Sequence, residues 1–135
     1  MSPWLEVSMR RDVLLPESIA RADGIGPEIN LGSKQGKLLV LTLGITRILE
    51  QQSLEISVWG SPDGEKWGAA PLAKFPPKFY CGLYSILLNL GSRQDVRFVH
   101  VRWKMSRWSK RENMPMFGFY VYAEESGARV SVAVA

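Results

Sequence analysis

The sequence predicts an all-β protein, an antiparallel jelly-roll-like β-sandwich that forms a single domain over residues 1–135. Short runs rich in β-branched and aromatic residues recur between clusters of turn-forming residues, and no stretch has a long apolar period of 3.6 residues. With 135 residues, of which 46% are apolar and 22% charged, the chain can bury one core. A second folded domain is not expected.

Seven strands are expected from these runs. In chain order they are Leu5–Met9, Lys37–Leu43, Leu54–Trp59, Tyr84–Leu90, Val96–Trp103, Phe117–Ala123 and Arg129–Ala135. Two of them, Leu54–Trp59 and Val96–Trp103, alternate apolar and polar residues with a period of two, so their apolar side chains should share one interior. The residues expected there are Leu54, Ile56, Val58, Val99, Val101 and Trp103. Trp67 is also expected in the core, whereas Trp59 lies on the outward phase.

Two segments are less regular. Residues 44–53 allow a helical alternative, because Ile45, Ile48 and Leu49 have helical spacing. Residues 12–36 contain several glycines and prolines, and we expect a long connection there rather than a strand.

The most specific local signal is the run Ser61-Pro62-Asp63-Gly64. Proline presets φ at the first central position of a turn, aspartate suits the second, and glycine accepts the left-handed conformation that follows. The sequence therefore predicts a tight reversal with positive φ at Gly64, leading into a hairpin.

Around this turn the chain resembles the discoidin-like or coagulation-factor C-type domains of the galactose-binding-like β-sandwich group. Three stretches carry the resemblance, namely the strand and turn over 54–67, the strand Arg97–Arg102 and the closing strand Phe117–Tyr122. It covers roughly Leu38–Glu124 and implies the sandwich fold. Because this fold serves lectins, adhesion domains and viral structural proteins, the resemblance does not specify a function. Unlike secreted members, the chain has one cysteine, Cys81, and so no intrachain disulfide.

The first residues predict no signal peptide, because Arg10, Arg11 and Asp12 interrupt the apolar stretch that export would need. No apolar run reaches the roughly 20 residues of a membrane helix. We therefore expect a cytoplasmic protein or a component of a particle assembled inside the cell. The formal net charge of +4 permits an anionic partner without requiring one.

Catalysis is not expected. His100 is the only histidine, and the glycine motifs of hydrolases, phosphate-binding loops and dinucleotide-binding folds are absent. A stacked or solvated role for His100 is favoured. No cofactor is expected, except that Asp23, Glu28 and Asn30 would offer oxygen ligands to a structural calcium ion in a glycine-rich loop. Ordinary turn chemistry is the favoured alternative.

Residues 97–111 are strongly basic and contain tryptophan but no acidic residue. The candidate ligand or interface residues are Trp59, Arg102, Lys104, Arg107, Trp108, Lys110 and Arg111. Such a surface would bind a carbohydrate or another anionic ligand, bind nucleic acid, or pair with acidic residues of the same or a neighbouring copy. Pairing is favoured, and Asp12, Glu17, Asp23 and Glu28 are the expected acidic partners.

The last residues alternate valine with small residues. Val130, Val132 and Val134 would form a strand that pairs within its own sandwich or with a second copy. The leading hypothesis is a non-enzymatic protein that self-associates as a homo-oligomer or as part of a capsid or other particle. A carbohydrate-binding module is the first alternative, and a nucleic-acid binder is the second.

Overall fold

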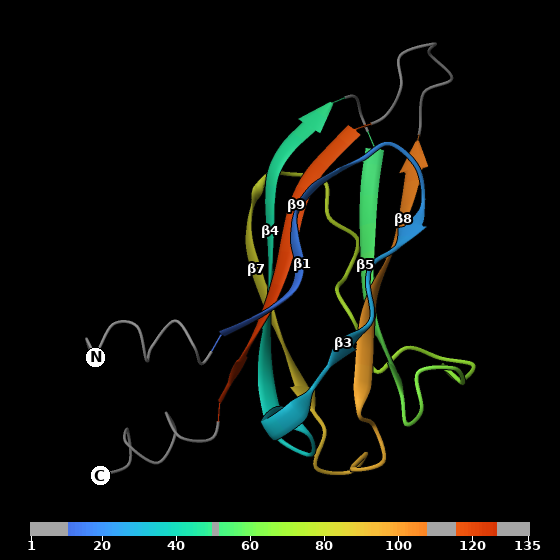
Figure 1. Ribbon diagram of the computed structural model, residues 1–135. Helices are drawn as coiled ribbons and strands as arrows, with labels where there is room; N and C mark the ends of the chain where they lie inside the picture. The colour runs from blue at the N-terminus through green and yellow to red at the C-terminus, as the bar shows by residue number, and fades with distance from the viewer. Residues whose placement is uncertain (1–10, 50–51, 108–115, 127–135) are drawn as a thin grey trace, which may run out of the picture.

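The computed structural model describes residues 11–49, 52–107 and 116–126. Two antiparallel sheets face each other across one core, as Figure 1 shows. Sheet A has the strand order β1-β9-β4-β7, and sheet B has the order β2-β8-β5-β6, with β3 also pairing with β8. This is the β-sandwich that the sequence predicts. None of the described residues forms a helix long and apolar enough to span a membrane.

The strands of sheet A are long and continuous. They are β1 (Arg11–Ala20), β9 (Met116–Glu125), β4 (Leu38–Leu49) and β7 (Gly82–Asn89). Sheet B contains β2 (Gly24–Ile25), β3 (Ile29–Asn30), β5 (Gln52–Ser61), β6 (Ala73–Lys74) and β8 (Phe98–Arg107). A short 3₁₀ helix, η1 (Gly32–Lys34), precedes β4.

The predicted alternation of β5 and β8 is confirmed. Leu54, Ile56 and Val58 are 0% exposed. On the paired strand, Val99 and Val101 are buried as well, and Val101 lies directly opposite Val58. Trp103 has the predicted phase but lies at the margin of the core, where its ring meets Phe119 edge-on and its Nε1 donates to the carbonyl of Ala22.

The expectation of a strand-free connection over residues 12–36 was wrong. Residues 11–20 form β1, which pairs with β9 along its length. The ladder tolerates Pro16 because β1 is an edge strand and its register shifts between Leu15 and Ser18. The shift breaks the regular alternation, and this hid the strand in the sequence.

The helical alternative for residues 44–53 was also wrong, because β4 continues to Leu49 and β5 begins at Gln52. The register of β4 against β9 shifts between Ile45 and Arg47. The shift lets both Ile45 and Ile48 pack against the core, three residues apart, so a bulged strand imitates helical spacing.

The predicted reversal at Gly64 is confirmed, since its φ is +82°. The chain does not form a tight hairpin, however. The partner of β5 is β6, which begins at Ala73, so a loop from Pro62 to Leu72 separates the paired strands. The predicted strands at Leu5–Met9 and Arg129–Ala135 lie outside the described residues.

Candidate functional site

An aromatic and basic cluster occupies the outer face of sheet B. The sheet B cluster consists of Trp59, Trp67, His100 and Arg102. On β8, His100 and Arg102 alternate with the buried Val99 and Val101, so they point away from the core. Trp59 is directly opposite His100 in the β5–β8 ladder. The antiparallel register thus brings residues about forty positions apart onto one surface.

The four side chains form one continuous contact. The Arg102 guanidinium carbon lies 3.9 Å from the centroid of the Trp59 ring, in a cation–π arrangement. Arg102 Nε donates a hydrogen bond of 2.8 Å to His100 Nε2. A face of the His100 ring stacks on Trp67, with centroids 3.8 Å apart and planes at 24°. The cluster is therefore a preformed surface.

The turn after β5 places Trp67 in this cluster. Ser61 Oγ accepts hydrogen bonds from the backbone N–H groups of Asp63 and Gly64. Asp63 Oδ1 accepts from the N–H groups of Glu65 and Lys66, and these bonds lower the pKa of the Asp63 carboxyl to about 2. The turn returns the chain over sheet B. The core position expected for Trp67 was wrong, because its ring covers His100 on the outer face.

The surroundings of His100 favour its neutral form. Its side chain is buried under Trp67, and burial, together with the charge of Arg102, lowers the pKa of the imidazole below its ordinary value. Because Nε2 accepts a hydrogen bond from Arg102, the proton of the neutral ring is on Nδ1. His100 is thus a stacked strand histidine that accepts a hydrogen bond from Arg102.

The structure brings together only part of the basic stretch. Arg102 and Lys104 lie on the outer face of β8, where Lys104 is opposite Glu55. Arg107 ends β8, and its backbone pairs with Gln52. The predicted residues Trp108, Lys110 and Arg111 lie outside the described residues.

Within one copy, the expected pairing of the basic stretch with the N-terminal acidic residues is not formed where the structure describes both partners. Asp23 Oδ1 instead accepts the backbone N–H of Met105, at 2.7 Å. Glu17 accepts the hydroxyl of Thr46. Glu55, which the sequence did not single out, pairs with Lys74 at 3.7 Å. Among the described residues, no acidic side chain forms an ion pair with Arg102 or Lys104.

The three candidate calcium ligands have separate environments. Asp23 contacts β8, and Asn30 Oδ1 accepts the backbone N–H of Gly32 at the start of η1. The Glu28 carboxylate lies against Gly64. Within residues 11–49, 52–107 and 116–126, no three His, Cys, Asp or Glu side chains lie close enough to hold a metal ion. Turn and strand contacts account for each of the three.

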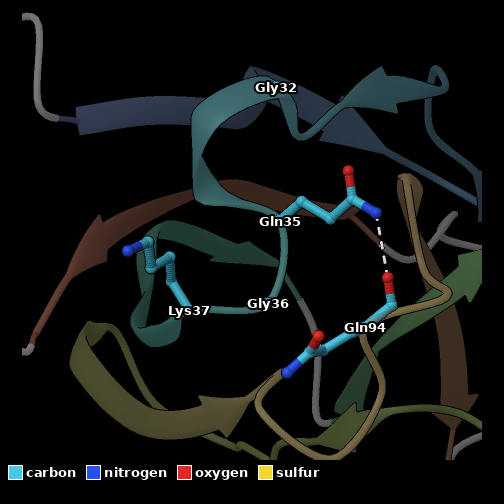
Figure 2. Close-up of a pocket in the computed structure, with 5 residues that line it drawn as sticks. All are labelled: Gly32, Gln35, Gly36, Lys37 and Gln94. Atoms are coloured by element: carbon cyan, nitrogen blue, oxygen red, sulfur yellow. Dashed lines mark hydrogen bonds between the residues drawn. The ribbon is translucent and has the colours of Figure 1, made fainter.

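A hollow of about 440 Å³ lies at the end of the sandwich where η1 meets the loop before β8. Figure 2 shows that Gln35 donates a hydrogen bond to the carbonyl of Gln94, while the Lys37 ammonium points away from both. Gly32 and Gly36 complete the lining. No aromatic ring lines this hollow, so it lacks the stacking surface that the sheet B cluster provides.

Sequence reasoning missed a second surface, the free edge of sheet A. Among the described strands, β7 has β4 as its only hydrogen-bonded neighbour. Leu83 and Leu87 on its outer face are 68% and 64% exposed. The available signal was the run from Gly82 to Asn89, which carries neither a charged residue nor proline. The predicted assembly valines Val130, Val132 and Val134 lie outside the described residues.

Comparisons with known proteins add a likeness in structure. No protein-family profile and no curated protein sequence matches the chain. The K3 cleaved adhesin domain of Lys-gingipain from Porphyromonas gingivalis W83 superposes with a TM-score of 0.47 and 11% identity, over 85% of this chain and 73% of that one. The K1 cleaved adhesin domain of the same protein gives 0.41 and 15%, over 84% and 66%. These values do not transfer a function to this chain.

Proposed function

We propose that this protein is a non-enzymatic β-sandwich that self-associates, and that two copies join edge to edge through β7. The single observation that carries the proposal is that β7 has a hydrogen-bonded neighbour on one side only, among the strands that the structure describes. A free edge strand presents a row of N–H and C=O groups that pair readily with another strand. Its apolar outer residues, Leu83 and Leu87, are 68% and 64% exposed, and such a pairing would cover part of their surface with the partner's side chains.

The two edges of sheet A differ in a way that supports this choice. The opposite edge, β1, carries Pro16 and two register shifts, which are features that prevent edge-to-edge pairing. By contrast, β7 pairs with β4 through eight consecutive residues, from Gly82 to Asn89, without a shift. This regular register would let the ladder continue into a second copy.

The sequence of β7 also favours one register. In an antiparallel pair, directly opposite residues lie on the same face of the sheet. A two-fold axis at Ser85 would place Leu83 opposite the partner's Leu87 on the outer face. The same axis would place the half-buried Tyr84 opposite the partner's Ile86 on the inner face. An axis one residue further along would oppose Leu87 to the partner's Ser85, which loses the apolar match.

Cysteine cross-linking tests this register. Opposite residues of an antiparallel pair have Cα atoms about 4.5–5.5 Å apart, which is within the range of a disulfide. In a Cys81→Ser background, Ser85→Cys should give a covalent dimer on mild oxidation at low protein concentration. Ser92→Cys, at an exposed serine in the loop after β7, is the matched control and should stay monomeric.

Mass in solution provides the second measurement. Leu87→Lys should shift the light-scattering mass from oligomer to monomer, whereas Ile25→Lys, at a position with similar exposure on sheet B, should leave it unchanged. A wild-type monomer at high concentration would refute self-association. Truncation after Gly127 tests whether β7 or the valine-rich C-terminal tail carries assembly. If the truncated protein stays folded but becomes monomeric, then the valine-rich tail carries assembly and the β7 proposal is wrong.

We also propose that this chain is related to the discoidin-like β-sandwich domains. The motif over residues 54–67, on which the resemblance rests, forms most of β5 and the turn after it, and the Trp67 ring at its end stacks on His100. A component of a particle assembled inside the cell is the role that we propose for such an oligomer.

A further inference from the structure

We infer that Arg102 is the anchor of a binding site for acidic sugars on the outer face of sheet B, in which its guanidinium receives a carboxylate or sulfate group. This inference does not depend on self-association, because the site lies on the other sheet from β7.

The guanidinium of Arg102 is already oriented before any ligand binds. The Trp59 ring supports its flat face, and the bond from Nε to His100 sets its rotation. Trp67 in turn holds the His100 ring by stacking. Since arginine loses considerable rotamer freedom when it binds a ligand, orienting it in advance reduces the entropy lost on binding.

The two terminal nitrogens of Arg102 remain available. Its described hydrogen bond uses Nε, and no acceptor among the described residues contacts either Nη atom. These two groups carry four N–H donors in a planar fork. Carboxylate and sulfate oxygens match such a fork, and charge-assisted bonds of this kind are about twice as strong as neutral ones.

The charges around Arg102 favour a ligand that offers one acidic group per sugar ring over a nucleic acid. Lys104 lies two residues along β8 on the same face and has no ion-pair partner within the described residues. Lys74 is partly neutralised by Glu55, and Glu28 lies beside the Gly64 turn. A nucleic acid would need a longer basic track, because its affinity depends on many phosphate contacts. One oriented arginine beside indole rings fits a single acidic group on a sugar ring better.

The polar surroundings of Trp59 fit a sugar ligand as well. Trp59 is half-buried, and its Nε1 donates to the hydroxyl of Ser57, the residue directly opposite Arg102. A sugar ring placed here would meet indole surface on one side and hydroxyl and guanidinium groups on the other. Indoles with one apolar and one polar side are enriched at such contact surfaces.

Calorimetric titration with defined oligosaccharides tests the site. The probes are oligogalacturonate, which carries carboxylates only, sulfated dextran oligosaccharide, which carries sulfates only, and unmodified dextran. Wild-type protein should bind at least one acidic probe and should not bind dextran. Arg102→Lys keeps the charge but loses the fork, and it should weaken that binding roughly tenfold or more.

Arg97→Ala is the matched control, because Arg97 is an exposed cation that flanks β8 and lies outside the sheet B cluster. It should change the affinity by less than about threefold, since bulk charge contributes little at moderate salt. Trp59→Leu provides a second test of the platform and should weaken binding as Arg102→Lys does. Thermal melting confirms that each variant is folded.

Three results would overturn the inference. The first is no binding of either acidic probe, and the second is an equal loss in Arg97→Ala and Arg102→Lys. The third is tighter binding of oligothymidylate than of both acidic sugars, which would assign the face to nucleic acid.

Discussion

Gly64 provides the sharpest test of how the turn after β5 is built. Its φ of +82° lies in the left-handed region, which strains an L-residue by about 1–2 kcal/mol. The turn cannot relax easily, because the Gly64 N–H donates a 2.8 Å hydrogen bond to Ser61 Oγ. A Cβ at Gly64 would also displace the Glu28 carboxylate. Gly64→Val should therefore lower the free energy of unfolding by roughly 1–2 kcal/mol or more.

Gly68 separates strain from collision. It has a φ of +77°, but a Cβ there would meet nothing within 4 Å. Gly68→Ala should thus show the strain alone, and Gly64→Ala should destabilise more than Gly68→Ala by the effect of moving Glu28. Urea unfolding followed by tryptophan fluorescence measures all three variants. A Gly64→Val protein whose unfolding free energy stays within about 0.5 kcal/mol of wild type would refute the reasoning.

Two further predictions follow from the faces of sheet B. Ile56 is 0% exposed, so Ile56→Ala should lower the free energy of unfolding, measured by urea titration, by roughly 2–5 kcal/mol. Ser57→Ala, on the opposite face of β5, should have a small effect. Equal losses in the two variants would contradict the assigned faces of the strand. His100 is the only histidine, and NMR titration should give it a pKa below the ordinary 6.5, which Trp67→Ala should raise by exposing the ring. As the pH falls, the unfolded chain binds a proton at His100 before the folded protein does. The contribution of neutral His100 to the free energy of unfolding is therefore fully present above pH 6.5 and is lost as the pH falls from 6.5 through the lower pKa of the folded protein. A free energy of unfolding that stays constant from pH 7 to below the pKa of the folded protein would contradict this prediction.

Local patterns predicted the interior of β5 and β8 because a period of two directly specifies which side chains share a face. The same reasoning failed for β1, where Pro16 and two register shifts interrupt the alternation. It also failed for Ile45 and Ile48, whose helical spacing results from a bulge. In each failure, pairing with another strand overrode the local signal.

The candidate site was only partly visible in the sequence. The outward phase of Trp59 and the basic stretch around Arg102 indicate these two residues as candidates. Their contact depends on the register of β5 against β8, which no local pattern specifies. The core position predicted for Trp67 was wrong, because the path of a loop after its turn depends on what the loop packs against.

By itself, then, the sequence determined the sandwich class, the buried phase of two central strands and the positive φ of Gly64, since these follow from alternation and turn chemistry among neighbouring residues. Only the tertiary structure decided that β7 lies at the edge of sheet A among the described strands and that Trp59, Trp67, His100 and Arg102 meet on one face. Both outcomes depend on the order and register of strands far apart in the chain, and long-range pairing sets these for the molecule as a whole.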